Sequence, residues 1–279
     1  MEWLDALILG IVQGLAEYLP ISSSGHLEIF REILGIDLPS DKILQFDIIL
    51  HAATVCSTIL VLWPMFSKLC SDFFTFRRNE GFYYVCKILV SCIPIGIVGV
   101  LLKDYVEDFF GEGLTVVGVC LCITALLLAF AQFSDYRMAK RGLTGADSGR
   151  KITWWDAFII GCAQAVAVLP GLSRSGTTIA TGILLGDRRS EVANFSFLMV
   201  IIPILGESLL DVVKMMKGSA EVAAQQASMS VWAILVGFFS AFIIGCIACK
   251  WMIALVKKGK LIYFAIYCII MGVICLLWN

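Results

Sequence analysis

Long apolar stretches, each close to the length that crosses a lipid bilayer, occupy most of this chain. A transmembrane helix needs about 20 predominantly apolar residues. We therefore expect an all-α, polytopic membrane protein in which each stretch spans the membrane once. The six stretches are Leu44–Phe66, Tyr83–Leu102, Leu114–Phe133, Phe195–Val213, Val231–Val256 and Leu261–Trp278.

Two further apolar regions are too short to span and are interrupted by Pro, Gly and Ser. One is Trp3–Leu19 followed by Gly25–Leu34, and the other is Trp155–Leu169 followed by Gly176–Leu185. Short apolar segments on either side of a polar elbow are typical of a re-entrant hairpin, which enters and leaves a membrane on the same side. Such irregular backbone is tolerated at membrane depth only where protein or a water-filled cavity surrounds it. Both elbows are therefore predicted to lie inside the helix bundle.

The two broken regions are copies of each other at an offset of 151 residues. Residues 1–135 are predicted to form repeat one, with a re-entrant hairpin at 3–36, and residues 154–279 repeat two, with a hairpin at 154–187. A cytoplasmic linker, 136–153, joins them. One hairpin plus three spans leaves the two ends of a repeat on opposite sides, so repeat two is predicted to be inverted. The matching residues are Asp5-Ala6 with Asp156-Ala157, Gly10 with Gly161, Gln13 with Gln164, Ser22-Ser23-Ser24-Gly25 with Ser173-Arg174-Ser175-Gly176, and, less closely, Phe46-Asp47-Ile48 with Phe195-Ser196-Phe197.

The distribution of positive charge predicts the orientation. Cytoplasmic loops of membrane proteins carry the excess of Lys and Arg. Here these residues cluster at 68–78, 137–151, 188–189 and 257–260, which places both termini outside. The first hairpin should then enter from outside and the second from the cytoplasm, with the elbows meeting near mid-membrane. The opposite side has only Arg31, Lys42, Lys103, Lys214 and Lys217.

Composition supports a membrane protein and excludes other classes. Of the 279 residues, 59% are hydrophobic and 15% charged, and the mean hydropathy is +0.91. Soluble domains have roughly 45–50% apolar and about 25% charged residues. A net charge of −1 provides no basic field for nucleic acid.

The 11 cysteines lie mostly in apolar runs, where they behave as small hydrophobes. Because Met1–Asp5 lacks a basic segment, the first apolar region is expected to remain in the mature protein.

The first elbow concentrates groups that could perform catalysis. Gln13 and Glu17 are four residues apart and share a helix face. Pro20 ends that half-helix, and His26 lies on the first turn of the next one. A carboxylate at this depth costs several kcal/mol by most scales, so Glu17 is a candidate functional residue. The alternative is a polar contact between helices. Three serines are placed to cap the second half-helix, whose N–H groups favour an anion: Ser22, Ser23 and Ser24.

The second elbow, Pro170–Thr178, contains an arginine between serines. Arg174 presents five donors beside the amides and hydroxyls of a helix N-terminus, a set that suits a phosphate group. The alternative, an arginine that reaches a lipid headgroup, would more naturally stand at a helix end than inside an elbow. The neighbouring candidates for phosphate binding are Gly171, Ser173, Ser175 and Thr178.

A third polar feature lies near the start of the first full span. Asp47 and His51 are four residues apart and share a face of this helix. A polar helix end with one interfacial histidine explains the pair equally well. The sequence leaves their participation open.

Together, the runs Gln13–His26, Phe46–Thr54 and Pro170–Thr178 resemble bacterial undecaprenyl-diphosphate phosphatases of the bacitracin-resistance type. The segments Ala193–Leu198 and Gly237–Phe242 extend the resemblance over nearly the full length. The resemblance implies a phosphatase of the bacterial plasma membrane that converts undecaprenyl diphosphate to undecaprenyl phosphate and phosphate. Such enzymes recycle the carrier lipid of peptidoglycan synthesis and usually require a divalent cation, here expected to be Mg²⁺ or Ca²⁺.

The resemblance also implies which residues act. The essential positions of the family fall on Glu17, Ser22, Ser23, His26, Ser173, Arg174 and Thr178. One departure is Gln13, where the family often has Glu, and this weakens any metal site built from two carboxylates.

The resulting hypothesis assigns a role to each elbow. Arg174 and the hydroxyl groups around it clamp the diphosphate. Glu17, helped by Gln13, holds the divalent cation against the phosphate oxygens. His26 acts as nucleophile or as general acid and base, with Ser23 as the competing nucleophile. The site is expected to open toward the outer face of the membrane.

Other functions fit parts of the pattern. Inverted repeats with broken helices are also the architecture of secondary transporters, so a transporter or flippase of a polyprenyl phosphate lipid is the main alternative. A channel is weaker, since no span shows a repeated polar stripe. The expected partners are the polyprenyl diphosphate lipid and the membrane, and the oligomeric state stays open, with a homodimer as one possibility.

Overall fold

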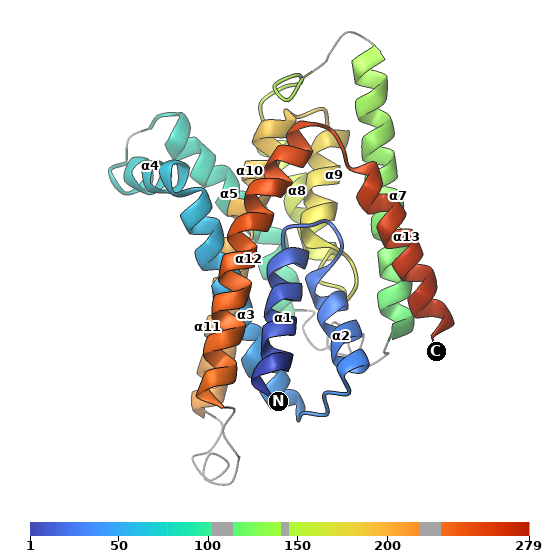
Figure 1. Ribbon diagram of the computed structural model, residues 1–279. Coiled ribbons are helices and arrows are strands. Elements are labelled where there is room, and N and C mark those ends of the chain that lie inside the picture. The colour runs from blue at the N-terminus through green and yellow to red at the C-terminus, as the bar shows by residue number, and fades with distance from the viewer. Residues whose placement is uncertain (77, 102–113, 141–144, 218–229, 279) are drawn as a thin grey trace.

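The protein is a bundle of helices (Figure 1). The computed structural model describes residues 1–76, 78–101, 114–140, 145–217 and 230–278, without the side chains of 40, 41, 100, 138, 139, 207 and 211–217. No β-sheet occurs in this part of the chain, which confirms the all-α class. The helices are α1 (Trp3–Ala16), α2 (Ser23–Leu34), α3 (Ser40–Val61), α4 (Trp63–Phe74), α5 (Glu80–Leu101), α7 (Leu114–Lys140), α8 (Trp154–Val166), α9 (Arg174–Leu184), α10 (Arg189–Met199), α11 (Ile201–Lys217), α12 (Val231–Lys257) and α13 (Ile262–Leu277).

Several helical segments are long and apolar enough to cross a membrane. Each has at least 20 residues, close to the length that spans a bilayer. The chain is therefore a multi-pass membrane protein. Within the described ranges, the five segments are Lys42–Val61, Glu80–Gly99, Leu114–Arg137, Arg189–Leu210 and Val231–Lys257.

The sixth predicted span is shorter than expected. Leu261–Trp278 folds as α13, which has 16 residues. At a rise of about 1.5 Å per residue this helix is roughly 24 Å long, less than the hydrocarbon thickness of about 30 Å. The preceding turn limits it, because Gly259 adopts φ 64° and the helix starts only after Leu261.

The first predicted span, Leu44–Phe66, also ends early. The helix α3 stops at Val61, and Leu62 (φ −98°, ψ 16°) separates it from α4. Pro64 explains the break, because it lacks an N–H donor and its ring clashes with the carbonyl four residues earlier. Figure 1 shows α4 projecting sideways from the bundle.

The hairpins α1–α2 and α8–α9 each pack closely on one long helix. A Cβ atom on Gly10 would lie 2.5 Å from the Gly237 carbonyl oxygen of α12. At the matching position, a Cβ atom on Gly161 would lie 2.3 Å from the Ser91 carbonyl oxygen of α5. Small residues let helix backbones approach in membranes. The duplicated glycine therefore fixes each hairpin against its own long helix.

The two elbows contact each other inside the bundle (Figure 1). The Ser175 hydroxyl donates a hydrogen bond to the Leu19 carbonyl at 3.3 Å. A Cβ atom on Gly25 would lie 3.1 Å from the Cα atom of Gly171. Segments about 150 residues apart in the chain thus share one buried junction.

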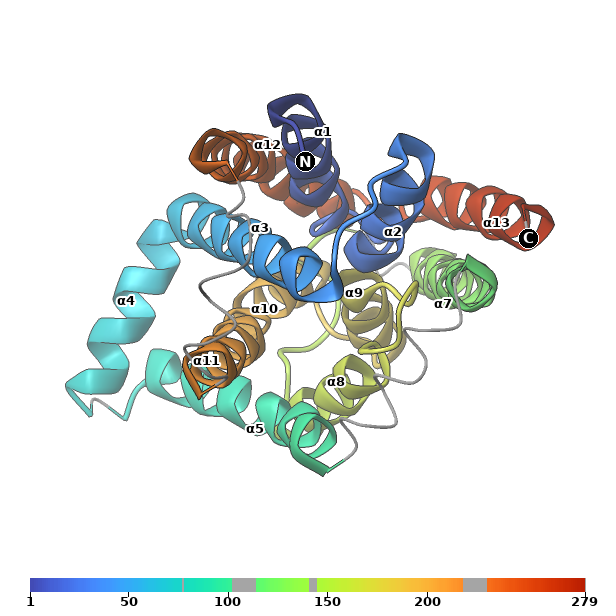
Figure 2. The ribbon, with the colours of Figure 1, turned by 90° about the horizontal axis from the view of Figure 1, so that it is seen from below.

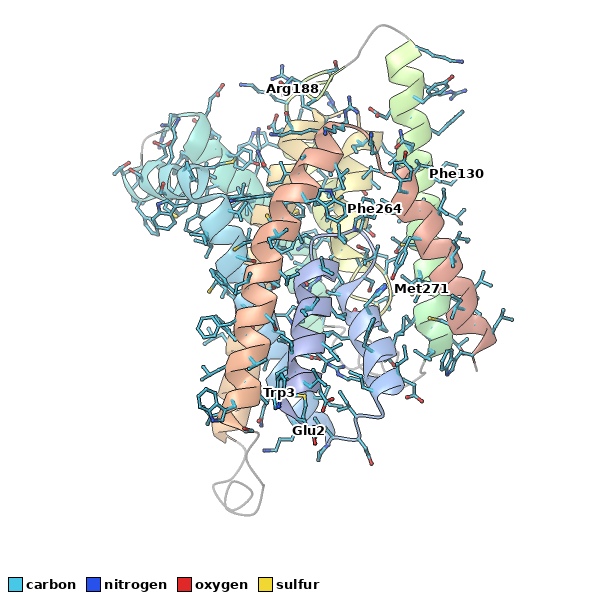
Figure 3. All side chains as sticks on the ribbon, in the orientation of Figure 1. Glu2, Trp3, Phe130, Arg188, Phe264 and Met271 are labelled. Carbon is cyan, nitrogen blue, oxygen red and sulfur yellow. The ribbon has the colours of Figure 1, made fainter. Side chains whose placement is uncertain are left out.

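The core and the outer surface divide as expected for a protein in lipid. In the view from below, α9 and α10 lie near the centre of the bundle (Figure 2). Phe195 and Ile179 on these helices are fully buried. Large apolar side chains such as Trp3 and Phe130 point outward, at 58% and 62% exposure (Figure 3). Apolar surface of this extent is explained by lipid contact.

Close packing at Gly161 leads to the first testable prediction. Gly161→Ala should lower the melting temperature of the purified protein in detergent, because overpacking costs about 1–3 kcal/mol. Gly99→Ala on α5 is the matched control, since nothing lies within 4 Å of the added methyl group. Equal melting temperatures for both variants would contradict this packing.

Candidate active site

The first elbow holds the Glu17 carboxylate at the end of α1. The Gln13 amide nitrogen donates to Glu17 Oε2 at 3.0 Å, and the Ser23 hydroxyl donates to the same oxygen at 2.8 Å. Ser22 caps α2 by accepting a hydrogen bond from the Gly25 backbone N–H at 3.3 Å. Its own backbone is in the left-handed region, with φ 71°, which turns the chain sharply enough to bring Ser23 back to Glu17. The carboxylate is thus fixed from two sides.

The second elbow holds Arg174 at the first position of α9. Gly171 adopts φ 86° and approaches the Val117 carbonyl so closely that a Cβ atom would lie 2.6 Å from it. Only glycine suits this position. Ser173 caps α9 by accepting from the Gly176 N–H at 3.0 Å, while its own N–H donates to Thr124 Oγ1 at 3.1 Å. The Ser173 hydroxyl therefore has a structural role at the N-terminus of α9.

The elbows join through an ion pair. Arg174 Nη2 lies 3.6 Å from Glu17 Oε1, and their side chains are 20% and 7% exposed. The carboxylate and the guanidinium predicted to share one site are therefore neighbours. The separation leaves the Arg174 donors only loosely engaged.

His51 on α3 is also close to Glu17. Its Nε2 atom lies 3.8 Å from Glu17 Oε2. The Asp47 carbonyl oxygen lies 2.8 Å from His51 Nδ1, and a carbonyl can only accept, so Nδ1 carries the proton. The Asp47 carboxylate pairs with Arg31 on α2. His51, whose participation the sequence left open, is thus an imidazole in contact with the Glu17 carboxylate.

His26 faces another direction. It is 3% exposed, and its Nδ1–H donates to the Ser22 carbonyl at 2.9 Å. Nε2 then accepts a hydrogen bond from the Tyr267 hydroxyl of α13 at 2.7 Å, and the two rings stack with centroids 5.6 Å apart. No ion pair or hydrogen bond joins His26 to Glu17 or Arg174 in the part of the chain that the structure describes. The His26 imidazole therefore links the first elbow to α13 and stabilises the turn at Ser22.

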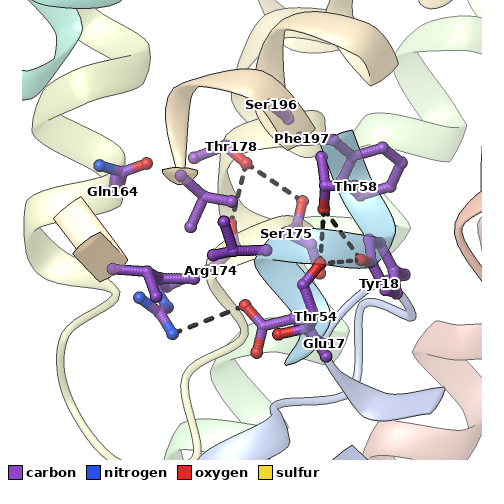
Figure 4. A pocket seen from close by; sticks show the side chains of 13 residues that line it. Glu17, Tyr18, Thr54, Thr58, Gln164, Arg174, Ser175, Thr178, Ser196 and Phe197 are labelled. Carbon is purple, nitrogen blue, oxygen red and sulfur yellow. Dashed lines mark hydrogen bonds and ion pairs between the residues drawn. The ribbon is translucent and has the colours of Figure 1, made fainter. Parts of the chain in front are cut away.

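A small cavity of about 20 Å³ lies beside the ion pair (Figure 4). This volume holds about one water molecule, so a phosphate group can enter only when the surrounding helices move apart. Four predicted site residues line it, namely Glu17, Arg174, Ser175 and Thr178, whereas the other candidates hold the elbows around it. The remaining lining residues are Tyr18, Thr54, Val55, Thr58, Gln164, Ser196, Phe197, Val200 and Ile204.

Sequence reasoning missed the polar group of α3 behind Glu17. The Tyr18 hydroxyl donates to the Thr54 carbonyl at 2.6 Å and contacts the hydroxyls of Ser57 and Thr58. The spacing of Thr54, Ser57 and Thr58 at i, i+3 and i+4 places them on one helix face. Three hydroxyls on one face of an apolar span are a signal that could have located this wall of the site.

The described residues contain no cluster of three or more His, Cys, Asp or Glu side chains that could bind a metal alone. Oxygen ligands are nevertheless present. Gln13 Oε1 is buried without a hydrogen-bond partner, and Gln13 adjoins the Glu17 carboxylate. Mg²⁺ is commonly held by one or two protein oxygens together with substrate phosphates and water. The two residues fit such a minimal site.

Comparison with known proteins decides the family. The model of the bacitracin resistance protein BacA family matches residues 6–274. This chain belongs to that family. The match includes both elbows and the cavity between them, so the resemblance drawn from the motifs is confirmed.

Relatives in the BacA family are similar over nearly their whole length. A protein of Bacteroides thetaiotaomicron named undecaprenyl-diphosphatase is 55% identical over 272 residues, covering 98% of this chain and 97% of the relative. One from Parabacteroides distasonis with the same name is 55% identical over 274 residues, with 98% and 97% covered. A more distant one, from Oceanobacillus iheyensis, is 36% identical, with 97% and 94% covered.

The Tyr18 contacts lead to the second prediction. Tyr18→Phe should lower the free energy of unfolding by about 1–2 kcal/mol, because it removes a buried hydroxyl group that forms several hydrogen bonds. The measurement is denaturant or thermal unfolding in detergent micelles. Tyr263→Phe on α13, which is 64% exposed, should leave stability within about 0.5 kcal/mol of the parent. A Tyr18→Phe protein as stable as Tyr263→Phe would show that these hydrogen bonds do not anchor the elbow.

Proposed function

We propose that this chain is an integral membrane phosphatase that hydrolyses undecaprenyl diphosphate to undecaprenyl phosphate and inorganic phosphate. The observation that carries the proposal is the pair Glu17 and Arg174, 3.6 Å apart beside a cavity at the N-terminus of α9. Family membership and the undecaprenyl-diphosphatase name of the relatives support the same activity. In the cell, this activity returns the carrier lipid to peptidoglycan synthesis and supports bacitracin resistance.

The second elbow binds the diphosphate. Arg174 offers several donors to phosphate oxygens, and the free N–H groups of α9 add a positive end. Ser175 and Thr178 lie on the first turns of the same helix and line the cavity. These groups stabilise the charge that develops on the transferring phosphoryl group.

The first elbow performs the chemistry. The Ser23 hydroxyl donates to Glu17 at 2.8 Å, so the carboxylate is placed to take its proton. The Ser23 oxygen then attacks the terminal phosphorus, the bond from that phosphorus to the bridging oxygen breaks, and the lipid monophosphate leaves. Water then attacks the phosphoserine, Glu17 returns its proton to the departing Ser23 oxygen, and phosphate is released. His26 fixes the turn that presents Ser23, through its bond to the Ser22 carbonyl.

A divalent cation, Mg²⁺ or Ca²⁺, would complete the charge balance of the site. Glu17 and Arg174 cancel each other's charge, which leaves the diphosphate charge to be offset. Glu17 and the unpartnered Gln13 Oε1 atom would hold the ion. When bound, it neutralises phosphate oxygens and polarises the phosphoryl group.

The membrane arrangement follows from the two repeats. The two repeats, 1–135 and 154–279, are inverted copies joined by the linker 136–153. Their hairpins, 3–36 and 154–187, enter from opposite faces of the plasma membrane. The contact between the elbows supports this arrangement. By the distribution of positive charge, the site opens toward the outer face. A homodimer stays a prediction.

The third prediction concerns Arg174. Arg174→Ala should reduce kcat/KM for phosphate release from a polyprenyl diphosphate by roughly 100-fold or more, because a preorganised donor set is lost. Arg174→Lys should restore only part of the activity, since a lysine cannot replace the planar fork. The assay uses purified protein in detergent, where no transmembrane gradient exists. Release of phosphate under these conditions also excludes a carrier that only moves lipid across the membrane. Near-normal release by Arg174→Ala would contradict the clamp.

The fourth prediction separates the two candidate nucleophiles. Ser23→Ala should lower kcat by roughly a thousandfold or more, as expected when a nucleophile is removed. His26→Gln should retain a larger share, because His26 positions the elbow and does not contact Glu17 in the described structure. Ser67→Ala on the exposed helix α4 serves as the control. The reverse order, with His26→Gln the less active variant, would assign the nucleophile to His26.

A further inference from the structure

The cavity extends to two buried polar groups that the proposed chemistry does not use. Gln164 on α8 is 1% exposed, and its Nε2 atom has no hydrogen-bond partner. Ser196 on α10 is 4% exposed, and its hydroxyl also lacks a partner. Both line the same cavity as Arg174 (Figure 4). A buried polar group without a partner costs about 1–3 kcal/mol, so its retention requires an explanation.

Comparison of the repeats indicates why these groups lack partners. Gln164 matches Gln13, whose amide nitrogen donates to Glu17 four residues later. In the second repeat, the residue four positions after Gln164 is Val168, so that acceptor is absent. Ser196 likewise stands at the position that resembles Asp47. Repeat two thus keeps the amide and loses both carboxylates.

The loss of these carboxylates makes this end of the cavity suitable for an anion. Among the lining residues whose side chains the structure describes, Glu17 is the single acidic one and Arg174 the single basic one. An amide and a hydroxyl beside a guanidinium offer hydrogen-bond donors without negative charge. Phosphate oxygens accept hydrogen bonds from such donors, and the Gln164 atom without a partner is the donor Nε2, not the oxygen that a metal ion would need.

We propose that Gln164 and Ser196, together with Arg174, form a second phosphate subsite when this cavity widens to admit the substrate. The proposal rests on the proposed function and extends it. One phosphate of the substrate lies beside Ser23 and Glu17, and the other phosphate, or the inorganic phosphate after release, is bound by Gln164 and Ser196. Arg174 lies between them and contacts both. The subsite thereby selects diphosphates over monophosphates.

The test uses two variants that keep the shape of the side chain. Gln164→Met and Ser196→Ala remove the polar groups, and neither should destabilise the fold, because no internal hydrogen bond is lost. With farnesyl diphosphate as substrate, KM should rise about tenfold in each variant, the effect of losing one hydrogen bond to a charged group, while kcat changes less. Thr177→Val is the control, because the Thr177 hydroxyl is also buried without a partner but does not line the cavity.

Product inhibition identifies which phosphate occupies the subsite. A raised inhibition constant for farnesyl monophosphate assigns the subsite to the lipid-linked phosphate, and a raised constant for inorganic phosphate assigns it to the released product. The proposal is overturned if KM and both constants stay within twofold of the parent, the result expected if water alone fills this space. An equal rise in Thr177→Val would overturn it as well.

A binding measurement separates this proposal from the proposed function. The shift in melting temperature produced by farnesyl monophosphate or inorganic phosphate depends on binding alone. If the parent protein shows such a shift but releases no phosphate from farnesyl diphosphate, the hydrolase assignment fails. A smaller shift in Gln164→Met and Ser196→Ala would then still support the subsite, and an unchanged shift would reject it.

Discussion

The fold depends on a carboxylate and a guanidinium that must neutralise each other within an apolar bundle. An isolated charge in such surroundings is expensive, and removing one partner of a buried pair commonly costs several kcal/mol. Glu17 meets Arg174 at 3.6 Å and also receives hydrogen bonds from Gln13 and Ser23. The pair can form only if the two elbows meet. Neutralising these two charges therefore requires that the hairpins pack against each other.

Duplication explains how one scaffold provides unlike chemical groups. Each hairpin uses a glycine to approach a long helix and a serine to cap its second half-helix. The variable positions then diverge: the first elbow has Glu17 where the second has Val168, and the second has Arg174 where the first has Ser23. A site between the copies therefore receives a carboxylate and a serine hydroxyl from one side and a guanidinium from the other.

Local sequence patterns predicted the elements but not every direction of their side chains. The elbows, their caps and the approach of Arg174 to Glu17 follow from motifs, because turns and helix termini are set by nearby residues. The bond from Tyr267 to His26 could not be predicted, since 241 residues separate them and nothing on α13 marks this tyrosine. His51 was ambiguous because its contact with Glu17 depends on how α3 packs against the first hairpin, which the pattern around His51 does not determine. The break at Leu62 was not predicted, although Pro64 causes it. The residues around Pro64 are apolar, so the sequence indicated one continuous span.

The shortness of α13 has a consequence for the surrounding lipid. A hydrophobic segment shorter than the bilayer draws the two leaflets together around it. With 16 residues beside the 27 of α7, α13 favours a local thinning on this flank of the protein. Tyr267, which contacts His26 of the first elbow, lies on this flank. A polyprenyl lipid approaching along α13 would have less hydrocarbon to cross before its phosphates reach protein donors.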